Sequence, residues 1–147
     1  MIKYFIDAWD KNKDKLRKYI ESNVQSDYAE SYEDLFGAVI DNIINGYNDI
    51  GFCSDIRTID YGDYQGTLIL AFAEKTYQPS VEETFYTVVQ YGSCSGCDTL
   101  QGIVGYNYDD KPNSQQVEDY MTLCLHMIQN IKCFGNIEDN WQIRDYK

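Results

Sequence analysis

The sequence contains little that would divide it into separate units. Only two of its 147 residues are proline and ten are glycine, and no linker concentrates either type. Apolar residues make up 44%, the usual share for a globular protein. A chain of this length buries roughly two thirds of its surface on folding. We therefore expect one domain over residues 1–147.

Long apolar runs are also absent. No stretch approaches the roughly 18–20 apolar residues that a membrane-spanning helix needs, so we expect no membrane association. The opening residues, MIKYFIDAWDKNK, lack the apolar run and the small-residue cleavage site of a secretory signal. The five cysteines are an odd number. Together these features predict a reduced protein of the cytoplasm.

Positive charge is scarce, because 12 Lys and Arg residues face 24 Asp and Glu residues, for a net charge of −12. Direct nucleic-acid binding needs clustered basic residues, so we do not expect it. Residues 1–20 hold six basic and three acidic residues, a net of +3, which leaves −15 for residues 21–147. A field of that sign favours encounter with a basic partner. Acidity can also serve only to keep a small protein soluble.

Apolar spacing predicts a helix over residues 3–21. Nothing apolar lies between Trp9 and Leu16 on its apolar face, which suggests a break near Asp10. A second helix follows the polar residues 22–30 and completes a helical part over about 3–47.

The second helix has a defined start and end in the sequence. Ser31 stands at the capping position, with Asp34 three residues later, and Gly46 marks the end. The last strong pattern predicts a helix over about 114–134, apolar over so much of its circumference that it should be largely buried.

The middle of the chain changes to a period typical of strands. Residues 56–61 and 67–73 flank the glycine-bounded loop 62–66, which predicts a β-hairpin. Both faces of 67–73 are apolar, so this strand should be central, and 84–91 predicts a third strand. The element order α-α-β-β-β-α predicts an α+β fold, with an antiparallel three-stranded sheet over about 56–91 covered by helices.

Cys94 and Cys97 form the sharpest local motif, C-x-x-C. This spacing suits a redox-active thiol pair, half of a zinc site, or a tight turn in which the cysteines pack as small apolar residues. We favour the turn, with Asp98 or Thr99 capping a short helix behind it.

Further ligands and bases for these thiols are few. Zinc would have to draw on Cys53, Cys124, His126 and Cys133. His126, the one histidine, falls in the predicted buried helix, where we expect a core residue and not a general base. The motifs of nucleotide-binding loops and of H-E-x-x-H metalloproteases are absent. We therefore expect no catalytic residue, no metal and no cofactor.

Tyrosine is abundant, with fourteen residues. Five of them directly follow an aspartate, at Asp27-Tyr28, Asp60-Tyr61, Asp63-Tyr64, Asp119-Tyr120 and Asp145-Tyr146. Tyrosine is enriched in interface cores, and a neighbouring carboxylate can pair with a basic group. The hairpin loop is accordingly the predicted contact surface, formed by Asp60, Tyr61, Asp63, Tyr64 and Gln65. Strand tyrosines can also be ordinary β-formers that pack across the sheet.

Two motifs carry a resemblance to a known group. GDYQGT (Gly62 to Thr67) and YGSCSGCDTLQ (Tyr91 to Gln101), with the N-terminal pattern FIDAWDKNKDKL, resemble a group of small, mostly uncharacterised proteins of bacteriophages and prophages. The resemblance implies a phage product in the cytoplasm of a bacterial host. It supplies no activity and no catalytic residues.

The functional hypothesis combines the charge, the tyrosines and this resemblance. It is a non-enzymatic binding protein that engages and inhibits a basic host protein, such as a nucleic-acid-handling or defence protein, in the manner of anti-restriction or anti-CRISPR proteins. The alternative is a thiol-redox or structural zinc function at Cys94 and Cys97.

Overall fold

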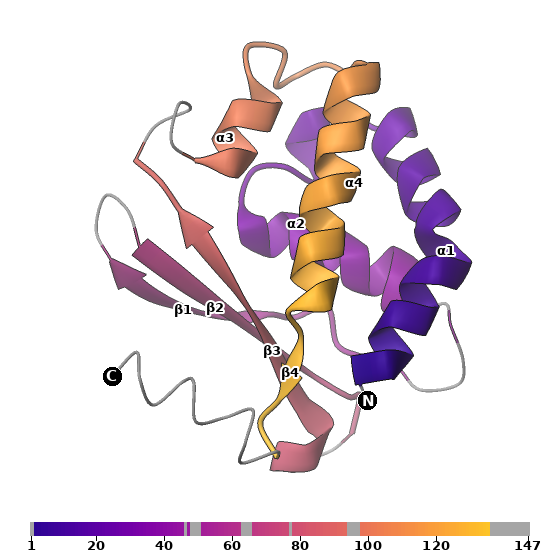
Figure 1. Ribbon diagram of the computed structural model, residues 1–147, viewed down its shortest axis with the longest axis vertical. Helices are drawn as coiled ribbons and strands as arrows, with labels where there is room; N and C mark the ends of the chain where they lie inside the picture. Colours follow the sequence, from indigo (N-terminus) through magenta and orange to yellow (C-terminus); the bar gives the residue numbers. More distant parts are fainter. Residues whose placement is uncertain are drawn as a thin grey trace.

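A computed structural model describes residues 2–45, 47, 51–62, 66–76, 78–93 and 98–135. The predicted α+β class is confirmed. Helices cover one side of a β-sheet, with α1 beside α4 (Figure 1). In chain order the main elements are α1 (Ile2–Ser22), α2 (Tyr32–Val39), β1 (Arg57–Gly62), β2 (Gly66–Ala73), β3 (Thr84–Tyr91), α3 (Thr99–Val104), α4 (Ser114–Gln129) and β4 (Lys132–Cys133). In this part of the chain no helix is long and apolar enough to cross a bilayer.

Helix α1 is continuous, so the predicted break near Asp10 is wrong. The gap in its apolar face is occupied by Asn12, whose Nδ2 donates to the Ile43 carbonyl at 2.9 Å. Ile43 lies near the end of the second helical segment, where carbonyl groups lack partners within the helix. The polar residue on the apolar face thus ties the two helical segments together.

The second helix changes its winding partway. Ser31 caps α2 by accepting the Asp34 N–H, as its position in the sequence predicts. After Val39 the chain forms a π-helical turn, Ile40–Ile44, in which the Asn45 N–H donates to the Ile40 carbonyl. The apolar pattern continues unbroken through this turn, so periodicity alone could not reveal it.

The sheet has four antiparallel strands in the order β1-β2-β3-β4, not the predicted three. The predicted hairpin is formed by β1 and β2, and β2 is central as expected. A Cβ atom at Gly66 would overlap the Tyr61 carbonyl oxygen, which explains the glycine where the hairpin returns. Alternation of side chains gives the sheet an inner face, directed at the helices, and an outer face.

The fourth strand lies inside the region predicted as helix 114–134. Helix α4 ends at Gln129, and Lys132–Cys133 then pairs with Phe85 and Tyr86 of β3. The Phe134 ring packs on Tyr86 with centroids 4.7 Å apart. The free edge of β3 supplies backbone hydrogen bonds that a helical sequence pattern does not show. The element order is therefore α-α-β-β-β-α-α-β.

Phenylalanine rings join the inner face of the sheet to the helices. Phe72 of β2 and Phe85 of β3 are both almost fully buried. Phe5 of α1 contacts both rings, at 5.9 and 5.2 Å between centroids, and Phe36 of α2 contacts Phe72 at 5.3 Å. Phe52, just before β1, packs among them. Edge-to-face contacts of this kind add to the stabilisation from area burial.

A second buried group joins α1 and α4. The Tyr28 and Tyr120 rings meet edge to face at 5.4 Å, and both side chains are fully buried. The Tyr28 hydroxyl donates to the Ile20 carbonyl, and the Tyr120 hydroxyl donates to Gln25 Oε1. Gln25 in turn donates to the Asn107 carbonyl. Each buried polar atom named here has a partner, as the cost of burying polar groups requires.

Alkaline titration should separate these buried tyrosines from the exposed ones. Burial raises the pKa of Tyr28 and of Tyr120 well above the ordinary value of about 10. The folded state favours the neutral phenols, so their contribution to stability is complete below a pH of about 10 and is lost as the pH rises further. We expect tyrosinate absorbance to rise in two steps, the second coinciding with loss of the circular dichroism signal. A single step with native circular dichroism would contradict the burial.

Candidate functional site

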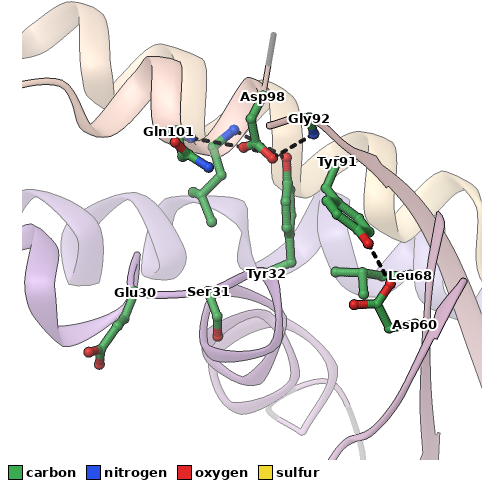
Figure 2. Close-up of a pocket in the computed structure, with 10 residues that line it drawn as sticks. Glu30, Ser31, Tyr32, Asp60, Leu68, Tyr91, Gly92, Asp98 and Gln101 are labelled. Carbon is green, nitrogen blue, oxygen red and sulfur yellow. Dashed lines mark hydrogen bonds between the residues drawn. The ribbon is translucent and has the colours of Figure 1, made fainter. Parts of the chain in front are cut away.

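A pocket of about 210 Å³ lies where the start of α2, the hairpin end of the sheet and the start of α3 meet (Figure 2). Its lining combines carboxylates with apolar and aromatic side chains: Glu30, Ser31, Tyr32, Asp60, Leu68, Tyr91, Gly92, Asp98, Leu100 and Gln101. Figure 2 shows Glu30 and Asp60 on opposite sides of the Tyr32 ring. The pocket thus presents negative charge at both ends and apolar surface between.

Asp98 organises the base of this pocket. Its carboxylate is 5% exposed and accepts three hydrogen bonds. Oδ1 accepts from the Tyr32 hydroxyl and the Gln101 N–H, both at 3.0 Å, and Oδ2 accepts from the Gly92 N–H at 2.9 Å. The bond from Gln101 caps α3, as the sequence predicts for Asp98. Because its oxygens accept bonds from three parts of the chain, Asp98 holds α2, the end of β3 and the start of α3 together.

Tyr32 carries this network to α2. Its hydroxyl donates to Asp98 and accepts the Leu100 N–H at 3.2 Å. Burial raises the pKa of Tyr32 to about 12, with the Leu100 N–H lowering it and Asp98 raising it. The side chain is therefore a neutral phenol at physiological pH, able to donate and accept at once.

Asp60 is positioned from across the sheet. Tyr91 of β3 lies opposite Gly66 of β2, on the inner face. Because Gly66 has no side chain, the Tyr91 ring can extend across β2, and its hydroxyl donates to Asp60 Oδ1 at 2.6 Å. The other carboxylate oxygen of Asp60 points toward the pocket (Figure 2). Asp60 itself lies on the exposed strand β1.

Further carboxylates gather around the pocket. The Glu33 carboxylate accepts the Thr58 hydroxyl of β1 at 2.7 Å. Desolvation and then the charges of Glu30, Asp109 and Asp34 raise the pKa of Tyr108, and Tyr108 lines a neighbouring pocket together with Glu30. We call the five exposed carboxylates the acidic end: Glu30, Glu33, Asp34, Asp60 and Asp109.

These carboxylates have no basic partner within the described residues. The one ion pair there joins Arg17 of α1 to Glu118 of α4, neither of which belongs to the acidic end. Carboxylates in a protein with 24 acidic and 12 basic residues cannot all be paired internally. The acidic end is therefore a concentration of uncompensated negative charge.

Asp60 and Tyr61, two residues of the predicted contact surface, lie on opposite faces of β1. Asp60 lines the pocket, whereas Tyr61 is 37% exposed on the opposite, outer face of β1. Asp63, Tyr64 and Gln65 lie outside the described residues. The prediction that tyrosines after aspartate mark a surface fails at two of its five sites, because Tyr28 and Tyr120 are in the core. The predicted buried helix 114–134 already indicated burial for Tyr120, whereas Tyr28 falls in residues 22–30, which the sequence predicts as a polar connection.

Cys94 and Cys97 are outside the described residues. Cys53, Cys124 and Cys133 form no disulfide, and no group of three or more His, Cys, Asp and Glu side chains in the described ranges could hold a metal ion. The expectation that His126 is a core residue is wrong, since it lies on the exposed side of α4.

Sequence reasoning missed Tyr32 and Tyr91 as parts of the site. Tyr32 looked like one apolar residue of a helix stripe, and Tyr91 looked like the last residue of a strand. Neither local pattern indicates that Tyr32 meets Asp98, 66 residues away, or that Tyr91 meets Asp60. The one local signal was the capping position of Asp98.

Removing the Tyr32 hydroxyl should destabilise the fold. Tyr32→Phe leaves one buried acceptor short of a donor and one buried N–H without an acceptor, so we expect the free energy of unfolding to fall by about 1–2 kcal/mol. Tyr106→Phe is the matched control, because the Tyr106 side chain is fully exposed and should change stability by less than about 0.5 kcal/mol. Urea denaturation measures both. Equal stability of the two variants would contradict the network.

The lining of the pocket is both apolar and acidic. The side chains of Asp98 and Tyr32 are hydrogen-bonded to each other and to the backbone of the surrounding elements. Leu68, Leu100 and the Tyr91 ring offer apolar contact, while Asp60 and Glu30 offer negative charge. Such a combination suits a long side chain with a cationic head. Comparison of the chain with protein-family models, curated proteins and solved structures found no match.

Proposed function

We propose that this protein is a non-enzymatic binding protein whose acidic end engages a basic surface on another protein and blocks it. The observation that carries the proposal is the pair of carboxylates, Glu30 and Asp60, that line one pocket, with the Glu33 carboxylate held by Thr58 of the same strand as Asp60. Uncompensated carboxylates on one part of a surface favour encounter with a cationic partner and select against anionic ones.

The partner that fits this charge is a protein that handles nucleic acid, because such proteins present clustered Lys and Arg. GDYQGT and YGSCSGCDTL resemble sequences of phage and prophage proteins, so we expect the partner in a bacterial host. The target class is a nucleic-acid-handling or defence protein of that host. Inhibition follows if the acidic end occupies the surface that the target uses for phosphate groups.

Capture from bacterial lysate, with a charge-matched control, tests this proposal. The acidic-end variant carries Glu30→Gln, Asp34→Asn and Asp109→Asn. The control variant carries Asp10→Asn, Asp14→Asn and Asp41→Asn, which are exposed and lie on α1 and the π-helical turn. Removing three negative charges changes the net charge from −12 to −9 in both variants.

We expect the acidic-end variant to lose its partner and the control to keep it. Binding should also weaken between about 0.1 M and 1 M salt, as the screening length falls from about 10 to 3 Å. Capture that is equal for both variants, or no specific capture by the native protein at low salt, would refute the proposal. A captured partner must lose its nucleic-acid activity when the native protein is added.

The alternative function at Cys94 and Cys97 remains a prediction, and it can be separated from the first. A double variant, Cys94→Ser with Cys97→Ser, should capture the same partner as the native protein. Elemental analysis of the purified protein should find no stoichiometric zinc. Loss of capture in the double variant, or one zinc per chain, would favour the thiol or zinc function instead.

A further inference from the structure

In the part of the chain that the structure describes, no strand lies beyond β1 at this edge of the sheet. All six residues of Arg57–Gly62 are exposed, and among the described strands only β2 pairs with them. In an antiparallel strand, alternate residues direct their N–H and C=O groups away from the neighbour. The outer side of β1 therefore presents a row of backbone donors and acceptors to the solvent.

The charged residues of β1, Arg57 and the inward-facing Asp60, disfavour the addition of a strand that lacks complementary charge. Natural sheets also blunt exposed edges with lysine, proline, bulges or a covering segment. The strand contains no lysine or proline, and its register with β2 runs from Arg57↔Ala71 to Gly62↔Gly66 without a bulge. Ile59 and Tyr61 are 44% and 37% exposed on its outer face. An open edge of this kind is a template for an added strand.

Hollows flank the edge on both faces of the sheet. On the inner face lies the pocket of Asp60, with the Glu33 carboxylate beside Thr58. On the outer face a hollow of about 820 Å³ is lined by Arg57, Thr58, Ile59, Ala71, Pro79, Val81, Thr84 and Phe134. Side chains of an added strand alternate between two faces, so one set would reach the acidic pocket and the other the apolar hollow.

We infer that β1 receives an extended segment of the basic partner as an additional strand, with a Lys or Arg side chain of that segment in the pocket beside Asp60. The apolar stem of the side chain packs on Leu68 and Tyr91, and its cationic head lies at the carboxylate. Apolar residues at the alternate positions pack against Ile59. The inference rests on the proposed function and names the part of the partner that is bound.

Charge argues for a basic partner segment over a second copy of this chain. Each copy carries a net charge of −12. Pairing β1 with β1 would bring the Asp60 and Glu33 carboxylates of two copies toward one another, and like charges opposite each other destabilise a strand pair.

A short peptide provides a direct probe. The test peptide is Val-Thr-Val-Lys-Val-Thr-Val with blocked ends, and the control peptide has Glu in place of Lys. We expect the Lys peptide to bind at least about tenfold more tightly and to slow amide hydrogen exchange in Arg57–Gly62. Asp60→Asn should weaken the Lys peptide by about tenfold, whereas Asp41→Asn should leave it unchanged.

Proline substitution distinguishes strand addition from attraction by charge alone. In any two adjacent residues of β1, the N–H of one points toward β2 and the N–H of the other points away from it. Proline lacks an N–H, so placing it at the second kind of position leaves every hydrogen bond between β1 and β2 intact. We therefore make Thr58→Pro and Ile59→Pro separately and use the variant that melts cooperatively near the native temperature. This variant keeps all acidic residues but should lose the Lys peptide.

Native affinity of the folded proline variant for the Lys peptide would overturn the inference, as would equal binding of the Lys and Glu peptides. A concentration-dependent dimer that the proline variant abolishes would overturn it too, because a second copy would then occupy the edge. If the acidic-end variant loses the captured partner and the proline variant keeps it, the proposed function stands and strand addition is wrong. If both variants keep the partner, both proposals are wrong.

Discussion

The contact of phenylalanine rings between the helices and the inner face of the sheet is the constraint on which the rest of the structure depends. Phe72 and Phe85 meet Phe5 and Phe36 only when β2 and β3 keep their observed register. A slip of one residue would turn the whole inner set outward. With that register fixed, the start of α2 lies against the hairpin end of the sheet, which is where the pocket forms.

At the hairpin end of the sheet, the helices are joined to the sheet by a buried carboxylate and not by aromatic rings. Asp98 joins the end of β3, the start of α3 and Tyr32 of α2 through three hydrogen bonds. Burying a carboxylate without such partners would be costly, so the three elements are held in one arrangement. The N–H groups of Gly92 and Gln101 both donate to Asp98, so the end of β3 and the start of α3 are held together through this one side chain.

The acidic end includes carboxylates at the start of α2 and Asp60 of the edge strand β1. The Glu33 and Asp34 carboxylates lie in the first turn of α2, where negative charge interacts favourably with the positive end of the helix dipole and stabilises the helix. Asp60 lies on an exposed edge strand, where the Tyr91 hydroxyl of β3 holds its carboxylate beside the pocket. This is why the proposals centre on Asp60 and the open edge of β1.

The sequence by itself determined the fold class, most helices, the hairpin and the central place of β2, because local periodicity and turn residues decide these features. It also determined the acidity and the capping roles of Ser31 and Asp98. Only the tertiary structure decided that α4 gives way to β4, because that depends on a free strand edge contributed by residues far away in the chain. It also decided that Tyr28 and Tyr120 are core residues while Asp60 faces a pocket. An aspartate followed by a tyrosine is the same local pattern whether the tyrosine is buried or exposed. Only the residues that pack against each ring decide its burial.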